Sequence, residues 1–334
     1  MATTNPRKPG GFKRRLIGFG AALFSLTMLT GLVNAGTANA WSNPDRIERL
    51  NVWSPSMGRN IPVQFQSATG GSGGNPAVYM LDGLRAPDTA NGWDIETNAF
   101  DQFKNDNVNV VMPIGGAASF YSDWIAPSNF NGQDFTYMWE TFLSSELPNF
   151  LADVKGVNRS GNAVLGISMG GSAALYLAAK HKPQFAFAGS MSGYLNLSTP
   201  GMPTSIRVAM LDAGLFNADS MWGPPWSPMW AQHDPFVFAE ELRGLSLFIS
   251  AASAIPDPGP NGDHPTRPVD FWNTGMGMGL EALSLASAKI FQVRLATMNI
   301  PATFSFPNYG IHAWNNWENQ LWTARPQILQ AVGR

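Results

Sequence analysis

The stretch GNAVLGISMGGSAALYLAAKH, residues 161–181, decides the fold and the chemistry of this chain. Its apolar run at 163–167 predicts a buried strand, and the alanine- and leucine-rich run from Ser172 predicts a helix. At the junction, residues 166–170 read GISMG and fit the pattern G-x-S-x-G, which holds a nucleophilic serine on a tight strand-to-helix turn. The alternative is an ordinary glycine-rich turn. The strand-turn-helix context favours Ser168 as a nucleophile, because the helix N-terminus stabilises developing negative charge.

Further apolar runs alternate with helical patterns along the rest of the chain. A half-buried strand is predicted at 59–66, and fully buried strands are predicted at 77–81, 108–113, 163–167, 186–191 and 245–251. Helices are predicted at 138–151, 172–181 and 271–298, with one more after His312. This alternation predicts an α/β fold with a mainly parallel central sheet and helices on both faces. The segment 193–236, rich in Gly, Pro, Trp and Met, is interpreted as an insertion near the active-site loops.

A serine nucleophile needs a base that takes its proton and an acid that orients the base. In this architecture the chain order is serine, acid, histidine. His312 follows the predicted strands and precedes the last helix, so we expect it to be the base. His181 lies on the helix after the serine and is interpreted as structural. His233 and His264 lie in loops and are interpreted as solvated.

The acid is less well specified by the sequence. Asp257 and Asp263 both lie in the Pro- and Gly-rich loop that follows the strand at 245–251. Asp257 is nearer the end of that strand, so it reaches His312 with less ordering of the loop. We therefore favour Asp257 over Asp263 as the catalytic acid, although either aspartate could simply cap a turn.

The N-terminus has the pattern of a secretory signal. A basic start is followed by a mostly apolar run at 16–33 and then by Ala38-Asn39-Ala40, the small residues that a signal peptidase needs. We expect residues 1–40 to be a signal peptide, residues 41–334 to form a single domain, and the protein to be secreted or held in the cell envelope. A membrane anchor is the alternative. Arg14-Arg15 leaves the choice between general and twin-arginine export open.

Charge and cysteine content exclude several classes of function. The predicted signal peptide holds five of the chain's 21 basic residues and none of its 23 acidic ones, so its removal leaves a net charge of −7. That charge argues against nucleic acid or an anionic membrane as a partner. The chain has no cysteine, which excludes disulfides, thiolate metal sites and cysteine nucleophiles. We expect neither a metal nor a cofactor.

Several long segments resemble the mycolyltransferases of the antigen 85 group, and the resemblance runs from about Leu50 to the C-terminus. The segments that carry it are SPSMGRNIPVQFQS, PAVYMLDGLRA, NGWDIETNAF, VVMPIGGAASFYSDW, WETFLSSELPNFL, GISMGGSAALYLAAKH, AGSMSGYLN, ADSMWGP and FSFPNYGIHAWNNW. The resemblance implies a secreted acyltransferase with an acylated serine. Its partners would be trehalose mycolates and cell-envelope glycolipids, with trehalose monomycolate as donor and a second trehalose monomycolate or cell-wall arabinogalactan as acceptor.

The resemblance also implies roles for individual residues. Ser168 would be acylated, with His312 as its base. The backbone amides of Leu84 and Met169 would form the oxyanion hole, and LDGLRA indeed follows a predicted buried strand. The positions that match trehalose contacts are Asp82, Arg85 and Trp314, and Asn196 stands where the family usually has a sugar-site aspartate.

Three departures from the family pattern are visible. The cysteine pair of the mycobacterial members is absent, and the aligned loop SAIPDPGP offers Asp257 where a glutamate of a glycine-rich loop is expected to be the acid. The segment at 100–110, which matches a fibronectin-contacting helix, is much more polar, so fibronectin binding is not carried over. The resemblance leaves the oligomeric state open.

The sequence also allows other interpretations of the tryptophans and of the function. The tryptophans Trp222, Trp226 and Trp230 either cover an acyl chain or pack within the insertion. A secreted carboxylesterase would use the same triad with water as the acceptor. A non-catalytic sugar- or matrix-binding relative would lack the serine or the histidine, and this chain has both.

Overall fold

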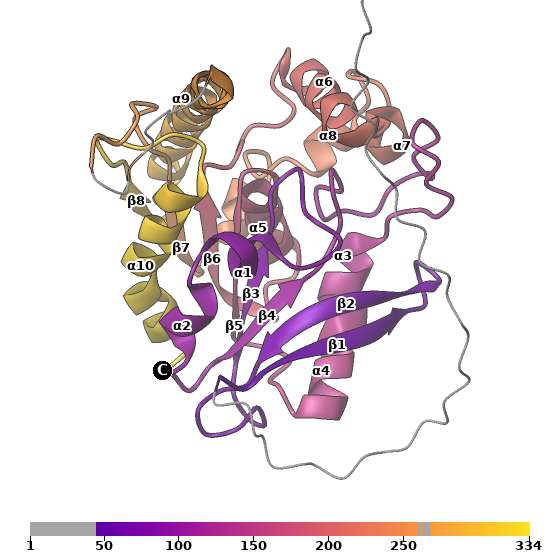
Figure 1. The fold of residues 1–334 in the computed structure, drawn as a ribbon, viewed down its shortest axis with the longest axis vertical. Coiled ribbons are helices and arrows are strands. Elements are labelled where there is room, and N and C mark those ends of the chain that lie inside the picture. The colour runs from indigo at the N-terminus through magenta and orange to yellow at the C-terminus, as the bar shows by residue number, and fades with distance from the viewer. Residues whose placement is uncertain (1–44, 260–261, 263–267) are drawn as a thin grey trace, which may run out of the picture. The chain divides into compact units, whose positions relative to one another are not determined.

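A computed structural model of the chain describes residues 45–259, 262 and 268–334, and for 268–272 it describes the backbone alone. Three predictions lie outside the described residues: the signal peptide at 1–40, Asp263 and His264. The prediction of an α/β fold with a mainly parallel central sheet is confirmed (Figure 1).

The sheet has eight strands in the order β1-β2-β4-β3-β5-β6-β7-β8. β1 and β2 form an antiparallel hairpin that pairs antiparallel with β4, and every pair from β4 to β8 is parallel. The strands are β1 Ile47–Ser54, β2 Arg59–Gln66, β3 Ala77–Leu81, β4 Asn109–Pro113, β5 Asn162–Ile167, β6 Phe185–Met191, β7 Ser246–Ser250 and β8 Thr303–Ser305. All residues of β3, β4 and β5 are buried, as expected for strands covered on both faces.

Helices cover both faces of the sheet, and alternate strand residues face the two layers. In β3, Tyr79 and Leu81 pack with α4, α5 and α9, whereas Val78 and Met80 pack with α2 and α10. The helices are α1 Gly92–Glu96, α2 Ala99–Phe103, α3 Trp139–Thr141, α4 Leu147–Lys155, α5 Met169–Lys180, α6 Met202–Gly214, α7 Ala218–Trp222, α8 Met229–Gln232, α9 Pro268–Thr297 and α10 Trp314–Ala331. A π-helical turn, Phe142–Glu146, joins α3 to α4.

The carboxyl ends of the parallel strands bring the candidate site residues to one edge of the sheet. Asp82 follows β3, Ser168 follows β5, Ser192 follows β6 and Ala252 follows β7 directly or after one residue. Ligands of open parallel sheets bind at this edge, because the loops that follow the strands gather there. The predicted insertion at 193–236 lies beside the same edge and holds α6, α7 and α8 (Figure 1).

Within the described ranges, none of the helices combines the length and the apolar character that a membrane span requires.

The strand-to-helix turn around Ser168 tolerates no side chain at Gly166. A Cβ added there would lie 2.4 Å from the carbonyl carbon and oxygen of Gly170, both of which are backbone atoms. We therefore expect Gly166→Ala to lower the free energy of unfolding by about 2–3 kcal/mol, measured by urea denaturation. Gly279→Ala is the matched control, because a Cβ there meets open space in the middle of α9; it should raise stability by roughly 1 kcal/mol. Equal effects of the two changes would contradict the argument.

Candidate active site

Ser168 occupies a strained turn between β5 and α5. Its backbone has φ 50° and ψ −120°, a conformation that a residue with a side chain rarely adopts. Its N–H donates to the carbonyl of Met191 at 2.9 Å, which ties the turn to the end of the neighbouring strand β6. The side chain is thereby held at the edge of the sheet, as a nucleophile elbow requires.

Two backbone N–H groups near Ser168 suit an oxyanion hole. Among the described residues, no acceptor is recorded for the N–H of Met169, at the first position of α5, or for the N–H of Leu84 after β3. Both positions are held from the same loop. Ala118 donates its N–H to the Leu84 carbonyl at 2.9 Å, and Phe120 donates its N–H to Met169 Sδ at 3.1 Å. These N–H groups can therefore stabilise an oxyanion without first breaking another bond.

His312 pairs with a glutamate on α9. Its Nδ1 lies 3.0 Å from Oε2 of Glu281, and both side chains are buried. The backbone N–H of His312 donates to the carbonyl of Gly277 one turn earlier on α9, at 3.1 Å. The Trp317 ring packs against the imidazole nearly at right angles, with centroids 5.0 Å apart. The ring of His312 is thus oriented from three sides.

The second oxygen of Glu281 is also saturated with donors. Oε1 accepts from Ser192 Oγ at 2.8 Å, from the N–H of Ala252 at 2.6 Å and from Asn316 Nδ2 at 3.4 Å. Ser192 Oγ in turn accepts from Trp317 Nε1 at 3.0 Å. A fully buried carboxylate needs such compensation, and the arrangement holds Glu281 ready to stabilise an imidazolium.

The expectation that Asp257 orients His312 is wrong in this structure. The carboxylate on His312 Nδ1 belongs to Glu281, and Asp257 Oδ1 instead accepts from the N–H of Gly259 at 2.8 Å, within its own loop. Asp263, the less favoured alternative, lies outside the described residues. The carboxylate that contacts His312 lies on α9, the helix that follows the loop, and an argument from distance along the loop did not consider that helix.

Asp82 and Trp314, two predicted sugar contacts, lie close together. Asp82 accepts from the N–H of Gly92 at 2.6 Å and from the N–H of Gly83 at 2.8 Å. A Cβ added to Gly92 would lie 2.5 Å from the Trp314 ring and 2.7 Å from Asp82 Oδ1, so only glycine lets the three groups meet. Burial raises the pKa of the Asp82 carboxyl group, and the two amide hydrogen bonds oppose that rise.

The other two predicted sugar contacts, Arg85 and Asn196, have different partners. Arg85 is exposed and forms an ion pair with Asp212 on α6. Asn196 is buried, and its Oδ1 accepts from Ser287 Oγ on α9 at 2.7 Å. Asn196 therefore anchors α9, and a sugar contact at this position stays a prediction.

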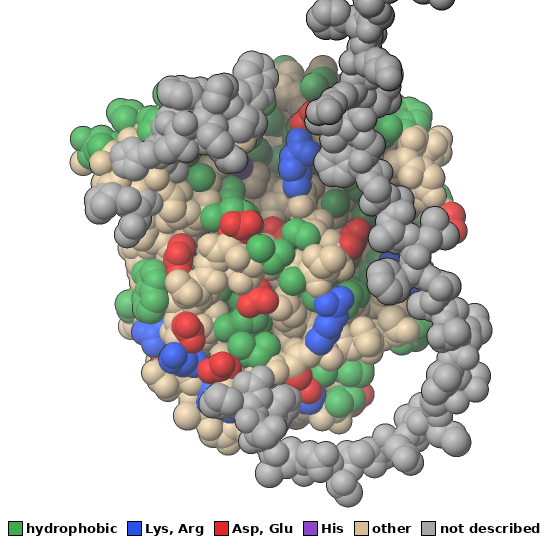
Figure 2. All heavy atoms as spheres, in the orientation of Figure 1, with side chains coloured by type: hydrophobic (Ala, Val, Ile, Leu, Met, Phe, Trp, Pro, Cys, Tyr) green, Lys and Arg blue, Asp and Glu red, His purple; other side chains and the backbone are tan. Residues whose placement is uncertain are grey.

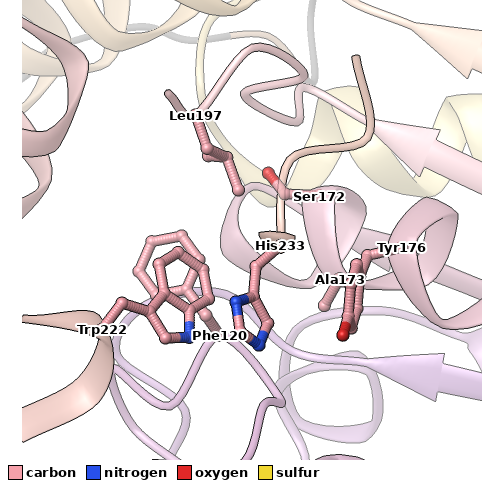
Figure 3. A pocket seen from close by; sticks show the side chains of 7 residues that line it. All are labelled: Phe120, Ser172, Ala173, Tyr176, Leu197, Trp222 and His233. Atoms are coloured by element: carbon pink, nitrogen blue, oxygen red, sulfur yellow. The ribbon is translucent and has the colours of Figure 1, made fainter. Parts of the chain in front are cut away.

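The tryptophans of the insertion separate into packed and exposed side chains. Trp222 and Trp230 are buried and meet edge to face, whereas Trp226 is 84% exposed. Figure 3 shows Trp222, His233 and Tyr176 side by side around a cleft beside α5, and this cleft has no room for a water molecule. Trp222 and Trp230 thus belong to the packed core of the insertion.

The prediction that His233 is solvated is wrong. Its ring stacks on Trp222 with centroids 4.5 Å apart, and its Nδ1 lies 2.8 Å from the carbonyl of Met229. Burial lowers the pKa of His233, because it disfavours the charged form of the ring. His181 is structural as expected, because its Nε2 lies 3.0 Å from Glu140 Oε1.

In the part of the chain that the structure describes, no group of three His, Asp or Glu side chains could hold a metal ion.

Comparisons with known proteins identify the family of this chain. Residues 54–328 match the family model named Esterase, described as "Putative esterase". The diacylglycerol acyltransferase/mycolyltransferase Ag85B of Mycolicibacterium smegmatis is 43% identical, over 97% of this chain and 98% of that protein. The Ag85C protein of Mycobacterium leprae, which has the same description, is 42% identical, over 93% of this chain and 91% of that protein. This chain belongs to the antigen 85 mycolyltransferase family.

A solved structure supports the same assignment. The crystal structure of Mycobacterium tuberculosis MPT51 (FbpC1) is 33% identical and superposes with a TM-score of 0.72, covering 86% of this chain and 98% of that one. The resemblance inferred from the sequence is therefore confirmed, and family membership makes the chain an acyltransferase. The hydrogen bond between Glu281 and His312 identifies a candidate for the acid, whose identity the sequence analysis had not settled.

The assignment of the acid can be tested by two isosteric changes. We expect Glu281→Gln to cut acyl-transfer turnover about ten-thousand-fold, because the neutral amide cannot stabilise the imidazolium of His312. Asp257→Asn is the matched control and should stay within about threefold of the parent, since the carboxylate on His312 Nδ1 belongs to Glu281. Turnover is measured by product formation, and circular dichroism checks that both variants fold. A crippled Asp257→Asn beside an active Glu281→Gln would refute the assignment.

Proposed function

We propose that this chain transfers a mycolyl group from trehalose monomycolate to a sugar hydroxyl through an acyl-enzyme on Ser168. The observation that carries the proposal is the buried Glu281–His312 pair at the same sheet edge as the strained turn of Ser168. A histidine fixed at Nδ1 by a carboxylate presents Nε2 as a base for a nearby hydroxyl. The family's mycolyltransferase names supply the substrate class.

The first half of the reaction forms the acyl-enzyme. His312 Nε2 takes the hydroxyl proton of Ser168 as Oγ attacks the ester carbonyl. The negative charge on the carbonyl oxygen is stabilised by the N–H groups of Met169 and Leu84. The tetrahedral intermediate then collapses, the bond to the trehalose oxygen breaks, and His312 returns the proton to that oxygen.

The second half passes the acyl group to an acceptor. His312 takes the proton of an incoming sugar hydroxyl as its oxygen attacks the acyl carbonyl. The bond to Ser168 Oγ then breaks, and His312 returns the proton to Oγ, which restores free Ser168. We propose that Asp82 and Trp314 line the sugar site, since a carboxylate close to an indole ring suits a polyhydroxylated ring. A second trehalose monomycolate would give the dimycolate, and the terminal arabinose of arabinogalactan would give a wall-bound ester.

We further propose that residues 1–40 direct export. The basic start, the apolar run at 16–33 and Ala38-Asn39-Ala40 support this, and an enzyme that acts on envelope glycolipids needs to be outside the cell.

The reaction is tested by incubating the purified protein with trehalose monomycolate and identifying the products by mass spectrometry. We expect free trehalose and trehalose dimycolate in equal amounts. Ser168→Ala should lower the rate on the order of a million-fold, because the triad acts as a unit. Ser205→Ala on α6 removes an exposed hydroxyl and should leave the rate unchanged. Free mycolic acid as the main product would instead identify a carboxylesterase, and full activity of Ser168→Ala would eliminate the acyl-enzyme.

Export is tested by N-terminal sequencing of the protein from culture fluid. We expect the sequence to begin at Trp41, directly after the small residues Ala38 and Ala40. Replacing both alanines with leucine should block cleavage and leave the precursor with the cells. A protein that keeps Met1 and stays in the cytoplasm would rule out the signal peptide.

A further inference from the structure

The first half of α9 has its polar and apolar faces reversed. A surface helix normally buries its apolar side chains and exposes its polar ones. Here Glu281, Ser284 and Ser287 are buried, whereas Met276 and Leu283 are 50% and 53% exposed. The remaining exposed side chains of this stretch are mostly apolar as well: Met278, Leu280, Ala282 and Ala286.

The reversal follows from what the buried face must hold. Glu281 bonds His312, Ser284 Oγ donates to the carbonyl of Ser192 at 2.9 Å, and Ser287 Oγ donates to Asn196. These contacts occupy the inner face of α9 with polar groups. They do not explain the outer face, where polar side chains would cost the fold nothing. An exposed apolar stripe of this length indicates a partner that covers it.

The outer face is also free of charge over several turns. Between residues 273 and 288 the one charged residue is Glu281, which points inward, and the first exposed charge is Lys289. Since every other exposed side chain in this stretch is uncharged, the partner surface itself should carry little charge.

A second apolar stripe lies on α6. Val208 and Leu211 are exposed and three residues apart, which places them on one side of the helix, and the exposed Leu215 directly follows its last residue. α6 and α9 both lie at the carboxyl edge of the sheet, the end of the domain that holds the candidate active site (Figure 1). In Figure 2 hydrophobic side chains gather near both helices, whereas most charged side chains of this face lie toward the opposite end.

We propose that these two stripes, here called the rim surface (Met276, Leu280, Leu283, Val208 and Leu211), dock the enzyme on an uncharged lipid surface. Apolar side chains at a membrane interface bind in proportion to the apolar area they bury. A net charge of −7 after export disfavours an anionic membrane, and it disfavours a second copy of this chain on the same surface. Neutral acyl chains meet both conditions.

The choice of a lipid as the partner rests on the proposed function, but binding to the lipid is tested without the acyl-transfer reaction. Docking would bring the aggregated acyl donor to the edge of the site, so that an acyl chain need not cross water. The binding is measured on the Ser168→Ala variant, which separates a failure to bind from a failure to transfer.

The test is sedimentation of the exported protein, purified from culture fluid, with vesicles of phosphatidylcholine. We expect the Ser168→Ala protein to partition onto these vesicles, and adding Leu283→Glu to weaken partitioning about tenfold. Adding Val208→Glu as well should weaken it about a hundredfold, since the two side chains are on different helices. Admixed anionic phosphatidylglycerol should weaken it too.

The matched control is Val154→Glu, whose side chain is 57% exposed on α4. Figure 1 shows α4 on the other side of the sheet edge from α6 and α9, toward the opposite end of the domain. It introduces the same charge and should leave partitioning unchanged. In the Ser168 background, Leu283→Glu should keep the parent rate on a monomeric short-chain ester, which shows that the fold and the triad are intact. The proposal is overturned if the parent does not partition, if Leu283→Glu and Val154→Glu behave alike, or if light scattering shows a dimer that Leu283→Glu dissociates.

Discussion

The buried carboxylate of Glu281 is the constraint on which the site depends. A charge taken out of water costs several kcal/mol unless it is paired and hydrogen-bonded. Its partners come from separate parts of the chain: Ser192 after β6, Ala252 after β7, and His312 and Asn316 around the start of α10. All of these hydrogen bonds to Glu281 can form together only if α9, α10 and the carboxyl edge of the sheet pack in one particular arrangement. The same bonds that lower the cost of burial therefore orient the histidine.

Much of the fold could be predicted because its determinants are local. Fully apolar runs such as 163–167 mark strands covered on both faces, and the glycines around Ser168 mark a turn that only small residues permit. β8, Thr303–Ser305, was not predicted because three residues carry no period. α6 was hidden because turn-forming residues surround it and its exposed stripe is apolar, so the usual amphipathic pattern is missing.

The acid could not be predicted from distance along the chain, because tertiary packing decides which carboxylate reaches His312. A signal was present in the sequence all the same. Glu281, Ser284 and Ser287 recur every three residues in an otherwise apolar helix, which places three polar groups on nearly one face. Polar residues on the buried face of a helix need partners, and a lone glutamate there indicates a pair with a base. The Asp257 argument considered only the loop and missed this pattern.

Helix geometry then links the chemistry to the outer surface of α9. Successive residues turn by about 100°, so Glu281 and Leu283, two residues apart, lie about 200° apart around the helix axis. A helix that turns its carboxylate toward His312 must present Leu283 to the outside. The inner face is committed to polar contacts with the site, and the outer face is uncharged. The proposed triad is therefore separated from whatever covers that face by about one helix diameter, on the order of 10 Å. An acyl chain of lipid length spans that distance easily, so one helix can both orient the base and face the source of the acyl group.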